Sequence, residues 1–244
     1  MVSVCMATYN GEKYIREQLD SILSQLDEND EVIISDDNST DNTLEIIKNY
    51  KDARIKTHQV KFRSSKKNFE NALKNAHGEY IFLSDQDDVW LPGKYKRCLE
   101  VLQVYDLVVT DSIIVDEKLS EIKTSFFEFY KSRKGILKNI YVNTYFGAFM
   151  AFKKKVLEYS LPFPKTDEIG HDVWIGLVAE IIGKVLFLKE PFLLYRRHEL
   201  SITNVTQKLR NRSKRSLYKK IWGRFLMLTE IIFFYLRYKK IRSI

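Results

Sequence analysis

Residues 80–90 have the sequence YIFLSDQDDVW, in which an apolar run passes directly into three carboxylates within four positions. The apolar residues 80–83 follow closely after a glycine and are typical of a buried strand. Asp85, Asp87 and Asp88 would then lie together where the strand ends, and their charges would repel one another. A divalent cation relieves such repulsion, and hard cations such as Mg²⁺ and Mn²⁺ take oxygen ligands. The segment therefore indicates either a metal site or an acidic turn exposed to solvent.

The length of the chain allows one large domain or a domain plus an appendage. It has 244 residues, of which 45% are hydrophobic and 13% aromatic, so it can build a sizeable core. Its two cysteines, Cys5 and Cys98, have neither disulfide-type nor zinc-type spacing, which indicates a reducing compartment. The first seven residues lack the basic leader and long apolar segment of a signal peptide. We therefore expect a cytoplasmic protein.

The net charge of +8 is unevenly distributed along the chain. Residues 205–244 hold twelve lysines or arginines and one acid, Glu230, which gives +11 and leaves −3 for the rest. Arg224 and Glu230 interrupt the aromatic and aliphatic stretch 216–237, so it falls short of the ~20 apolar residues of a membrane-spanning helix. This asymmetry indicates an anionic partner for the tail, either a membrane surface or nucleic acid.

Strands and helices are predicted to alternate along the first half of the chain. Apolar runs indicate strands over 2–7, 31–35, 54–58, 79–83 and 107–110. Apolar residues at helical spacing indicate helices over 11–26, 41–51, 66–76 and 92–104, the last beginning at Pro92. In the second half we expect an apolar segment over 144–152, a helix over 170–182 and strands over 185–188 and 192–195, and we leave 126–134 unassigned.

This alternation predicts an α/β fold with a mainly parallel central sheet that helices cover on both faces. Such sheets bind ligands at the carboxyl ends of their strands. Three polar clusters lie at those ends, namely 8–10, 36–39 and 85–88. A crevice lined by all three would suit a polar, anionic ligand held partly through metal. The sequence contains neither the glycine motif of dinucleotide-binding folds nor that of P-loops.

In order and spacing, several motifs resemble those of the family 2 inverting glycosyltransferases, most closely the bacterial rhamnosyltransferase-like branch. They are VCMATYNG (4–11), SDDNSTD (35–41), the segment 78–92, GAFMAF (147–152), HDVW (171–174) and YRRH (195–198). The resemblance covers residues 2–204. It implies a GT-A fold for residues 1–204, followed by a basic amphipathic helical tail over 205–244. His171 departs from the family pattern, since many members have a second acid there.

The resemblance implies a nucleotide-diphosphate sugar as donor. Tyr9 would stack on the nucleotide base and Asp37 would accept its imino N–H. From the residues alone, a core or turn aromatic and a helix cap are the alternatives. Lys67 either contacts a phosphate or is an exposed helix lysine. Close to Tyr9, the same site would include Thr8, Asn10 and Glu12.

The segment 85–87 corresponds to the family's Asp-x-Asp element. A divalent cation, Mn²⁺ or Mg²⁺, would act as a Lewis acid on the leaving diphosphate, and one or two protein acids are enough to hold it. By the family pattern, Asp87 is the best direct ligand. Asp85 either joins it at the metal or contacts ribose or a metal-bound water. Asp88 either helps or caps the next helix.

Asp172 matches the family's catalytic base. Inversion at the anomeric carbon is a single in-line displacement, so one carboxylate must accept the proton of the attacking hydroxyl; such general base catalysis contributes roughly 10²–10⁴-fold. The helix N-terminus would favour the ionised form of Asp172. From the residues alone, an ordinary helix-start aspartate is the simpler interpretation.

Arg197 and His198 follow a strand that should return toward the diphosphate. A guanidinium group can bind a phosphate with two hydrogen bonds, and imidazole can bind a metal or a phosphate. We therefore assign Arg197 to donor binding and His198 to metal binding. A structural histidine is the alternative for His198.

These assignments predict an inverting enzyme that transfers a sugar to a hydroxyl of a cell-surface glycan or lipid-linked acceptor. The branch makes a deoxyhexose such as rhamnose a plausible sugar. Residues 205–244 would hold the protein at the anionic inner face of a membrane as a peripheral protein. Packing of the tail on the body or on a second copy is the alternative.

Two other classes of function compete with this one. A metal-dependent nucleotidyltransferase or pyrophosphatase could use the same pocket, but it would need a lysine- or glycine-rich phosphate loop near residue 10, which is absent. A non-enzymatic protein could bind an anionic polymer through the basic tail, which would leave the acids unexplained. No DNA- or RNA-binding motif is visible, so we expect no nucleic-acid partner.

Overall fold

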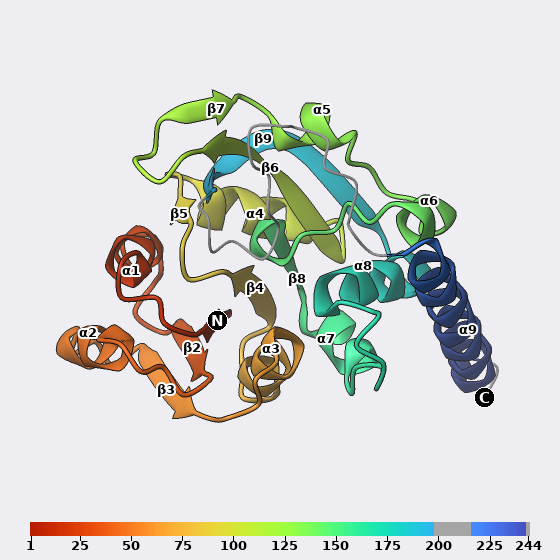
Figure 1. The fold of residues 1–244 in the computed structure, drawn as a ribbon, viewed down its shortest axis with the longest axis horizontal. Coiled ribbons are helices and arrows are strands. Elements are labelled where there is room, and N and C mark those ends of the chain that lie inside the picture. The colour runs from red at the N-terminus through yellow and green to blue at the C-terminus, as the bar shows by residue number, and fades with distance from the viewer. Residues whose placement is uncertain (198–215, 243–244) are drawn as a thin grey trace.

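The computed structural model describes residues 1–197 and 216–242, in which helices cover both faces of one sheet (Figure 1). The strand order is β3-β2-β1-β4-β8-β6-β9-β5, with β7 paired to β6. The parallel strands of the first half are β1 (Val2–Thr8), β2 (Glu31–Asp36), β3 (Ile55–Gln59) and β4 (Tyr80–Ser84).

The chain leaves β1 on one side, to form β2 and β3, and then returns to place β4 on the other side. This reversal creates a crevice at the carboxyl ends of β1 and β4, where open α/β sheets bind ligands. Both β1 and β2 are buried along almost their whole length, which explains their continuous apolar sequences. The order of these strands therefore indicates a ligand site at the carboxyl ends of β1 and β4.

Three helices connect these strands: α1 (Ile15–Leu23), α2 (Thr43–Asn49) and α3 (Ser65–Lys74). In α1, Ile15, Leu19 and Ile22 recur at helical spacing and are fully buried. Helix α3 packs on β1 and β2, whereas α1 contacts α2 and the second half of the sheet. Each helix is shorter than predicted, because its terminal residues form turns.

The second half of the sheet mixes parallel and antiparallel pairs. Its strands are β5 (Val89–Trp90), β6 (Leu107–Val115), β7 (Glu121–Lys123), β8 (Met150–Lys153) and β9 (Val185–Arg196). Strand β8 runs antiparallel between β4 and β6, and β9 runs parallel to β6. The two strands predicted over 185–195 are one strand, β9, whose register against β6 shifts near Asp111. The predicted α/β class is confirmed, and purely parallel pairing holds only for β1–β4.

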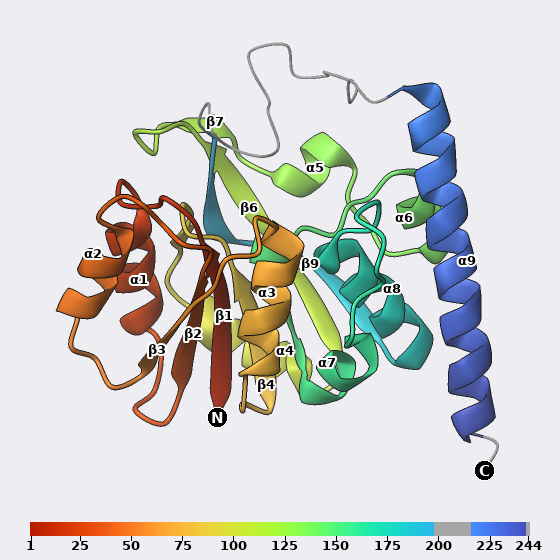
Figure 2. The same cartoon turned by 60° about the horizontal axis from the view of Figure 1, so that its bottom comes forward.

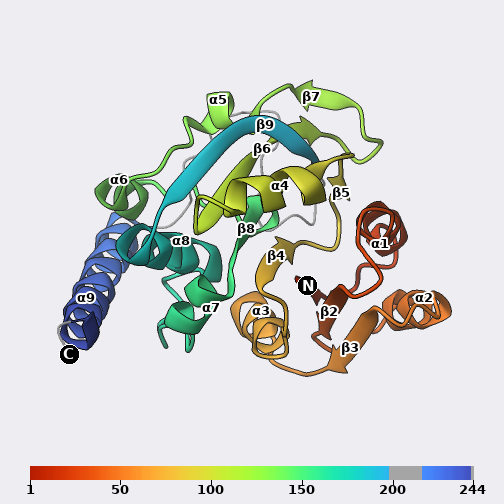
Figure 3. The same ribbon diagram turned by 180° about the vertical axis from the view of Figure 1, so that it is seen from behind.

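The helices of this half are α4 (Lys94–Leu102), α5 (Phe126–Tyr130), α6 (Ile136–Tyr141), α7 (Lys154–Ser160) and α8 (His171–Ile182), with a 3₁₀ turn, η1 (Gly147–Phe149). Helix α4 lies across the strands on the face seen from behind (Figure 3). It begins at Lys94 and not at Pro92, because Gly93 before it has a φ of 88°, outside the helical region. The unassigned segment 126–134 contains α5.

The last helix, α9 (Leu217–Arg242), packs against α8 and α6 at the edge of the molecule (Figures 1 and 2). Its buried side chains recur at helical spacing: Met227, Ile231, Phe234 and Tyr238. One stripe of the predicted tail helix therefore packs on the body. No helix within the described ranges is both long and apolar enough to cross a membrane.

Candidate active site

Three polar segments meet at one edge of the sheet, as their positions after β1, β2 and β4 predict. The register pairs Thr8 with Asp36 and Met6 with Ser84, so the strands end at nearly the same level. Thr8 is buried, and its hydroxyl donates to Asp36 at 2.8 Å. This bond ties the ends of β1 and β2 together beneath the crevice.

The loop after β1 presents Tyr9 to solvent, with 57% of its surface exposed. Asn10 has a φ of 49°, and its side-chain oxygen accepts from the backbone N–H of Thr40 at 2.8 Å. Glu12 accepts from the backbone and the side chain of Asn42, the residue that precedes α2. Asn10 and Glu12 therefore hold the loop to the segment after β2, and an exposed aromatic ring remains free to stack on a ligand.

Asp37 holds the backbone of the loop before α3. Its carboxylate accepts from the N–H groups of Phe62, Arg63 and Ser64, at 2.5, 2.9 and 3.0 Å. Only 8% of Asp37 is exposed. A base contact by Asp37 stays a prediction, and it would require this carboxylate to share or exchange these bonds. Lys67, in the first turn of α3, is exposed.

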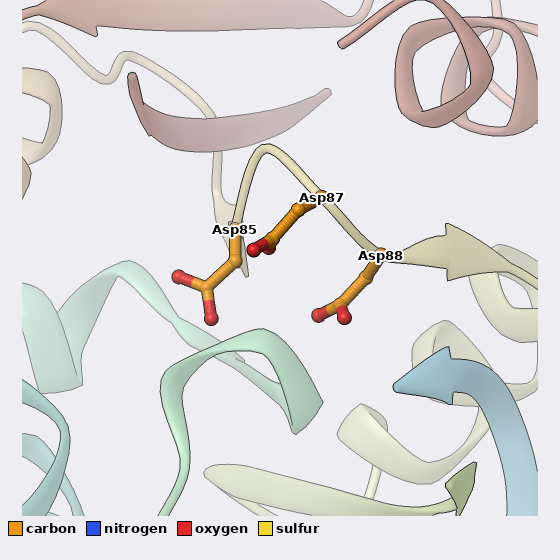
Figure 4. Close-up of side chains that lie close together, drawn as sticks. All are labelled: Asp85, Asp87 and Asp88. Atoms are coloured by element: carbon orange, nitrogen blue, oxygen red, sulfur yellow. The ribbon is translucent and has the colours of Figure 1, made fainter. Parts of the chain in front are cut away.

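The three acids after β4 project to the same side of their loop (Figure 4). Each offers a carboxylate oxygen, and the three oxygens lie within 4.8 Å of one another. Asp88 is 1% exposed, and its Oδ2 has no hydrogen-bond partner among the described residues. The predicted clustering of Asp85, Asp87 and Asp88 is therefore present in three dimensions.

Burial and mutual repulsion favour the protonated forms of two of these acids. Desolvation, followed by the charges of Asp87 and Asp172, raises the pKa of Asp85 to about 7. Desolvation and the charges of its two neighbours raise the pKa of Asp88 well above its ordinary value. A cation bound beside these carboxyl groups would stabilise their ionised forms and lower their pKa values.

Lys94 lies under the acidic cluster, and sequence analysis missed it. Its side chain is fully buried, with Nζ 2.8 Å from the carbonyl oxygen of Ala148 and 4.7 Å from the centre of the Trp90 ring. Desolvation lowers its pKa to about 8, although the charges of Asp88 and Asp85 act in the opposite direction. One signal in the sequence could have identified it. Lys94 lies one helical turn before Cys98, on the apolar face of α4, and a lysine buried on such a face needs a polar or charged partner.

The loop 85–88 is held by side chains from distant elements. Gln18 of α1 is fully buried and donates to the carbonyl oxygen of Asp85 at 3.0 Å. Gln86 brackets the backbone of Tyr9, accepting from its N–H at 2.9 Å and donating to its carbonyl at 3.0 Å. Arg196 of β9 donates from Nε to the carbonyl oxygen of Asp87 at 2.7 Å, and its N–H bonds Asp88 at 3.0 Å. Three separate elements therefore fix the positions of the acids.

Arg197 points to a different environment. Its guanidinium donates to the hydroxyls of Tyr195 and Tyr130, at 3.1 and 3.3 Å, and it is 9% exposed. Within the described part of the chain, the hydrogen bonds of its side chain include none to the three acids, whereas Arg196, which we had not assigned, contacts two of them. Phosphate binding by Arg197 stays a prediction, and His198 lies outside the described residues.

Asp172 lies in the first turn of α8, beside the crevice. Its Oδ1 accepts from the N–H of Val173 at 2.7 Å. Desolvation outweighs its backbone hydrogen bonds and raises its pKa to about 6. The predicted ionising effect of the helix N-terminus is therefore weaker than the effect of burial. Because the charge of Asp172 also raises the pKa of Asp85, the two carboxyls face one region of the site.

His171, which replaces the second acid of the family pattern, is a neutral packing residue. Its ring stacks on Phe69 with centroids 4.1 Å apart, and burial lowers its pKa to about 3. Gly147 of η1 lies against it: a Cβ at Gly147 would be 3.2 Å from Nε2 of His171 and 3.9 Å from Cβ of Asp172. Turn η1 therefore forms a wall next to Asp172.

The acidic cluster fits a hard divalent cation. It supplies only oxygen ligands, and its geometry brings the three acids within reach of one ion. The raised pKa values of Asp85 and Asp88 show that negative charge in the cluster is not neutralised by nearby positive groups, so a bound cation would be favourable. Asp85 and Asp87 are the residues that would hold Mn²⁺ or Mg²⁺, and Asp88 could join them through Oδ2, since only its Oδ1 is bonded to the backbone of Arg196.

Comparison with known proteins agrees with this geometry. The chain belongs to glycosyl transferase family 2, whose family model matches residues 3–161. It is 43% identical over 105 residues to the dTDP-rhamnosyl transferase RfbG of Shigella flexneri, a match that covers 40% of this chain and 36% of that protein.

A second relative matches over a longer stretch. This is the UDP-Glc:alpha-D-GlcNAc-diphosphoundecaprenol beta-1,3-glucosyltransferase WfaP of Escherichia coli, 30% identical over 183 residues, covering 74% of this chain and 71% of that protein. Among solved structures, S. aureus TarS 1-349 in complex with UDP-GlcNAc has a TM-score of 0.65 at 23% identity, covering 81% of this chain and 59% of that one. That likeness shows the GT-A-type fold. The match spans about a third of RfbG and under two thirds of the TarS chain.

Proposed function

We propose that this protein transfers a sugar from a nucleotide-diphosphate donor to a hydroxyl of a glycan, with inversion at the anomeric carbon. The observation that carries the proposal is the position of Asp172, whose carboxyl lies near enough to Asp85 to raise its pKa and is next to η1. A single displacement needs a donor site and one base facing each other across the reacting carbon. Family membership supports the same chemistry.

On the donor side, residues of the chain bind and orient the nucleotide. The exposed ring of Tyr9 stacks on the base, and Asp37 accepts from it. Thr8, Asn10 and Glu12 hold these two loops in place through the bonds described above. Lys67 and Arg197 are the candidate phosphate contacts. A divalent cation held by Asp85 and Asp87 would supply positive charge to the departing diphosphate.

On the acceptor side, Asp172 takes the proton of the attacking hydroxyl. Its raised pKa suits this role, because a base with a pKa of about 6 is mostly ionised at neutral pH and still accepts a proton readily. Inversion is the outcome that membership of this family supports, and Asp172 is the candidate base because the neighbouring His171 is neutral and packed against Phe69.

The names of relatives suggest finer details. The similarity to RfbG supports a deoxyhexose donor such as dTDP-rhamnose. The similarity to WfaP supports a lipid-linked acceptor. We propose further that the protein is held at the cytoplasmic face of an anionic membrane by its basic C-terminal region. Exposed aromatic residues and seven cations over residues 216–242 support that placement.

The test combines donor binding with transfer. Thermal stabilisation by a panel of nucleotide sugars, with Mn²⁺ or Mg²⁺, identifies base and sugar class. Asp172→Asn should keep this stabilisation and lose transfer by roughly 10²–10⁴-fold. Asp167→Asn, a matched change at an exposed aspartate five residues earlier, should do neither. Transfer that survives in Asp172→Asn would show that Asp172 is not the base, and donor hydrolysis without transfer would favour a pyrophosphatase.

A further inference from the structure

Helix α6 exposes apolar side chains although it belongs to the body of the protein. Leu137 and Tyr141, one helical turn apart, are 78% and 67% exposed, and Val142 after them is 49% exposed. Residues 131–142 also contain four cations and no acid. Within this segment, Lys131, Arg133 and Lys134 are exposed. Apolar and cationic side chains thus share one surface.

Helix α9 has a second apolar face besides the stripe that packs on the body. Its members recur at helical spacing and are 39–57% exposed: Ile221, Phe225, Leu228, Ile232 and Leu236. Trp222 and Phe225 stack with ring centroids 5.6 Å apart. Residues 216–242 carry seven cations and one acid, which gives +6. The described helix is therefore apolar on two faces and strongly basic.

The two exposed faces meet at Arg224. Its Nη2 donates to the carbonyl oxygen of Tyr141 at 3.0 Å, and its guanidinium lies 4.4 Å from the centre of the Tyr141 ring. At 100° per residue, the exposed apolar face of α9 is on the side of the buried stripe where Arg224 lies. Figure 2 shows α6 beside the N-terminal half of α9. The two helices that expose these apolar side chains are therefore neighbours, joined through Arg224 and Tyr141.

We propose that residues 131–142 and α9 together form one docking surface for an anionic lipid bilayer. This deepens the membrane proposal above, which assigned binding to the C-terminal region only, and it rests on that proposal. A segment that combines exposed aromatic rings, leucines and cations lies at the boundary of headgroups and acyl chains. Each cation near an anionic surface adds to the attraction.

Charge decides between a bilayer and a second copy of this chain as the occupant. Residues 131–142 carry a net charge of +4, and residues 216–242 carry +6 after Glu230, the one acid in either segment, is counted. Two copies meeting through this surface would bring like charges together, whereas anionic headgroups would neutralise them. Glu168, against Gly223, and Glu180, at the N–H of Gly135, border the surface, and their two charges leave it strongly positive.

Docking through this surface would orient the candidate active site relative to the bilayer. Residues 143–146 run from α6 directly into η1, whose Gly147 lies against Asp172. Docking through α6 would therefore place the wall beside Asp172 near the bilayer, where the hydroxyl of a lipid-linked acceptor is available. The tail alone, at the outer edge of the molecule, would not set this orientation.

Co-sedimentation of the full chain with phosphatidylglycerol-containing vesicles, and with neutral phosphatidylcholine vesicles, tests the surface. Leu137→Glu and Lys134→Glu should each weaken binding to anionic vesicles by about tenfold. Both side chains are exposed, so folding should be unaffected, as circular dichroism can check. The matched controls are Val104→Glu, at a residue 63% exposed, and Lys96→Glu, both at α4, and they should bind as the parent does.

The outcomes separate this proposal from the proposed function. If both α6 variants bind anionic vesicles as tightly as the parent while Phe225→Glu does not, the tail docks alone and the inference is wrong. If the parent binds neither vesicle type but elutes as a dimer that Leu137→Glu dissociates, the surface is an interface between copies. Transfer to a water-soluble acceptor without vesicles should be equal in all variants, so its loss would implicate the site and not the surface.

Discussion

Asp172 is a buried carboxyl group whose pKa lies above the ordinary value for an aspartate. Desolvation raises its pKa to about 6, and the acidic cluster across the crevice adds nearby negative charge. In the proposed mechanism the base must be ionised to accept a proton, so the proton that Asp172 retains below this pKa would block transfer. Its environment thereby sets a pH limit on activity.

We expect kcat/KM to fall about tenfold per pH unit below pH ~6 and to be level above it, because only ionised Asp172 is active. The measurement is transfer between pH 5 and 8 at fixed metal concentration. Asp172→Asn should show a much lower rate without this acidic limb, whereas Asp167→Asn should retain it. A limb that persists in Asp172→Asn would assign the pH dependence to another group.

Asp85 should make the metal-free protein less stable as pH rises. Its pKa is about 7 in the folded protein against an ordinary 3.8, so the folded state binds more protons between these values. Stability therefore falls across this window as pH increases. Asp85→Asn removes the titration and should raise the free energy of unfolding at pH 8 by on the order of 1–3 kcal/mol.

Urea denaturation with chelator, at pH 5 and pH 8, measures the Asp85 effect. The gain from Asp85→Asn should be clearly larger at pH 8 than at pH 5, since the penalty disappears fully only below the ordinary pKa of 3.8. Added Mn²⁺ should stabilise the parent more than the variant, since it removes the repulsion that the variant lacks. An equal gain at both pH values would mean that the change acts through packing and not through charge.

At the scale of elements, the donor loops are positioned by contacts between segments far apart in the sequence. Gln86 brackets Tyr9, and a Cβ on Gly11 would lie 2.4 Å from Oε1 of Gln86. The loop after β1 can approach the loop after β4 this closely only because residue 11 has no side chain. The pairing of two loops, and not either loop alone, sets the donor site.

Gln86→Ala should weaken donor binding by about three- to tenfold, because two hydrogen bonds of modest net value are lost. Gly11→Ala should do the same by displacing the Gln86 side chain, and the double variant should be little worse than either. Gln103→Ala, at an exposed glutamine of the sheet's other end, is the control. Isothermal titration with the nucleotide diphosphate measures these affinities. Additive losses in the double variant would contradict a shared contact.

At the scale of the whole molecule, α9 is joined to the body by one stripe of side chains. Phe234 is 4% exposed and meets Trp174 of α8 edge to face, with ring centroids 5.8 Å apart. Its neighbour Phe233 is 68% exposed. The same residue type in adjacent positions therefore has a packed role and a surface role.

Phe234→Ala should lower the free energy of unfolding by about 3–5 kcal/mol if α9 unfolds together with the body. Phe233→Ala should change it by less than about 0.5 kcal/mol, and it should weaken vesicle binding instead. Thermal and urea denaturation monitored by tryptophan fluorescence make the comparison. Equal effects of the two changes on stability would show that the stripe does not hold α9 to the body.

The local sequence pattern was sufficient to predict the main strands and helices and the clustering of polar residues at one edge of the sheet. Apolar runs and helical spacing located β1, β2, β4 and α8, and parallel strands necessarily bring their carboxyl ends to one edge. The clustering of the acids after β4 followed from the same pattern, whereas the role proposed for Asp172 came from the family resemblance and stays a prediction. Local pattern failed for short elements such as β5, β7 and α6, which tertiary contacts stabilise.

Long-range contacts determined which side chains do the positioning. Nothing near Arg196 or Arg197 in the sequence separates their roles, but alternation along β9 sends Arg196 to the acidic loop and Arg197 to Tyr130 and Tyr195. The same holds for Lys94, whose burial beneath the acids depends on where α4 crosses the sheet. Residue chemistry, spacing and family resemblance determined which acids to propose as the reacting groups, whereas their pKa values and supporting contacts arise from burial, which exists only once the chain is folded.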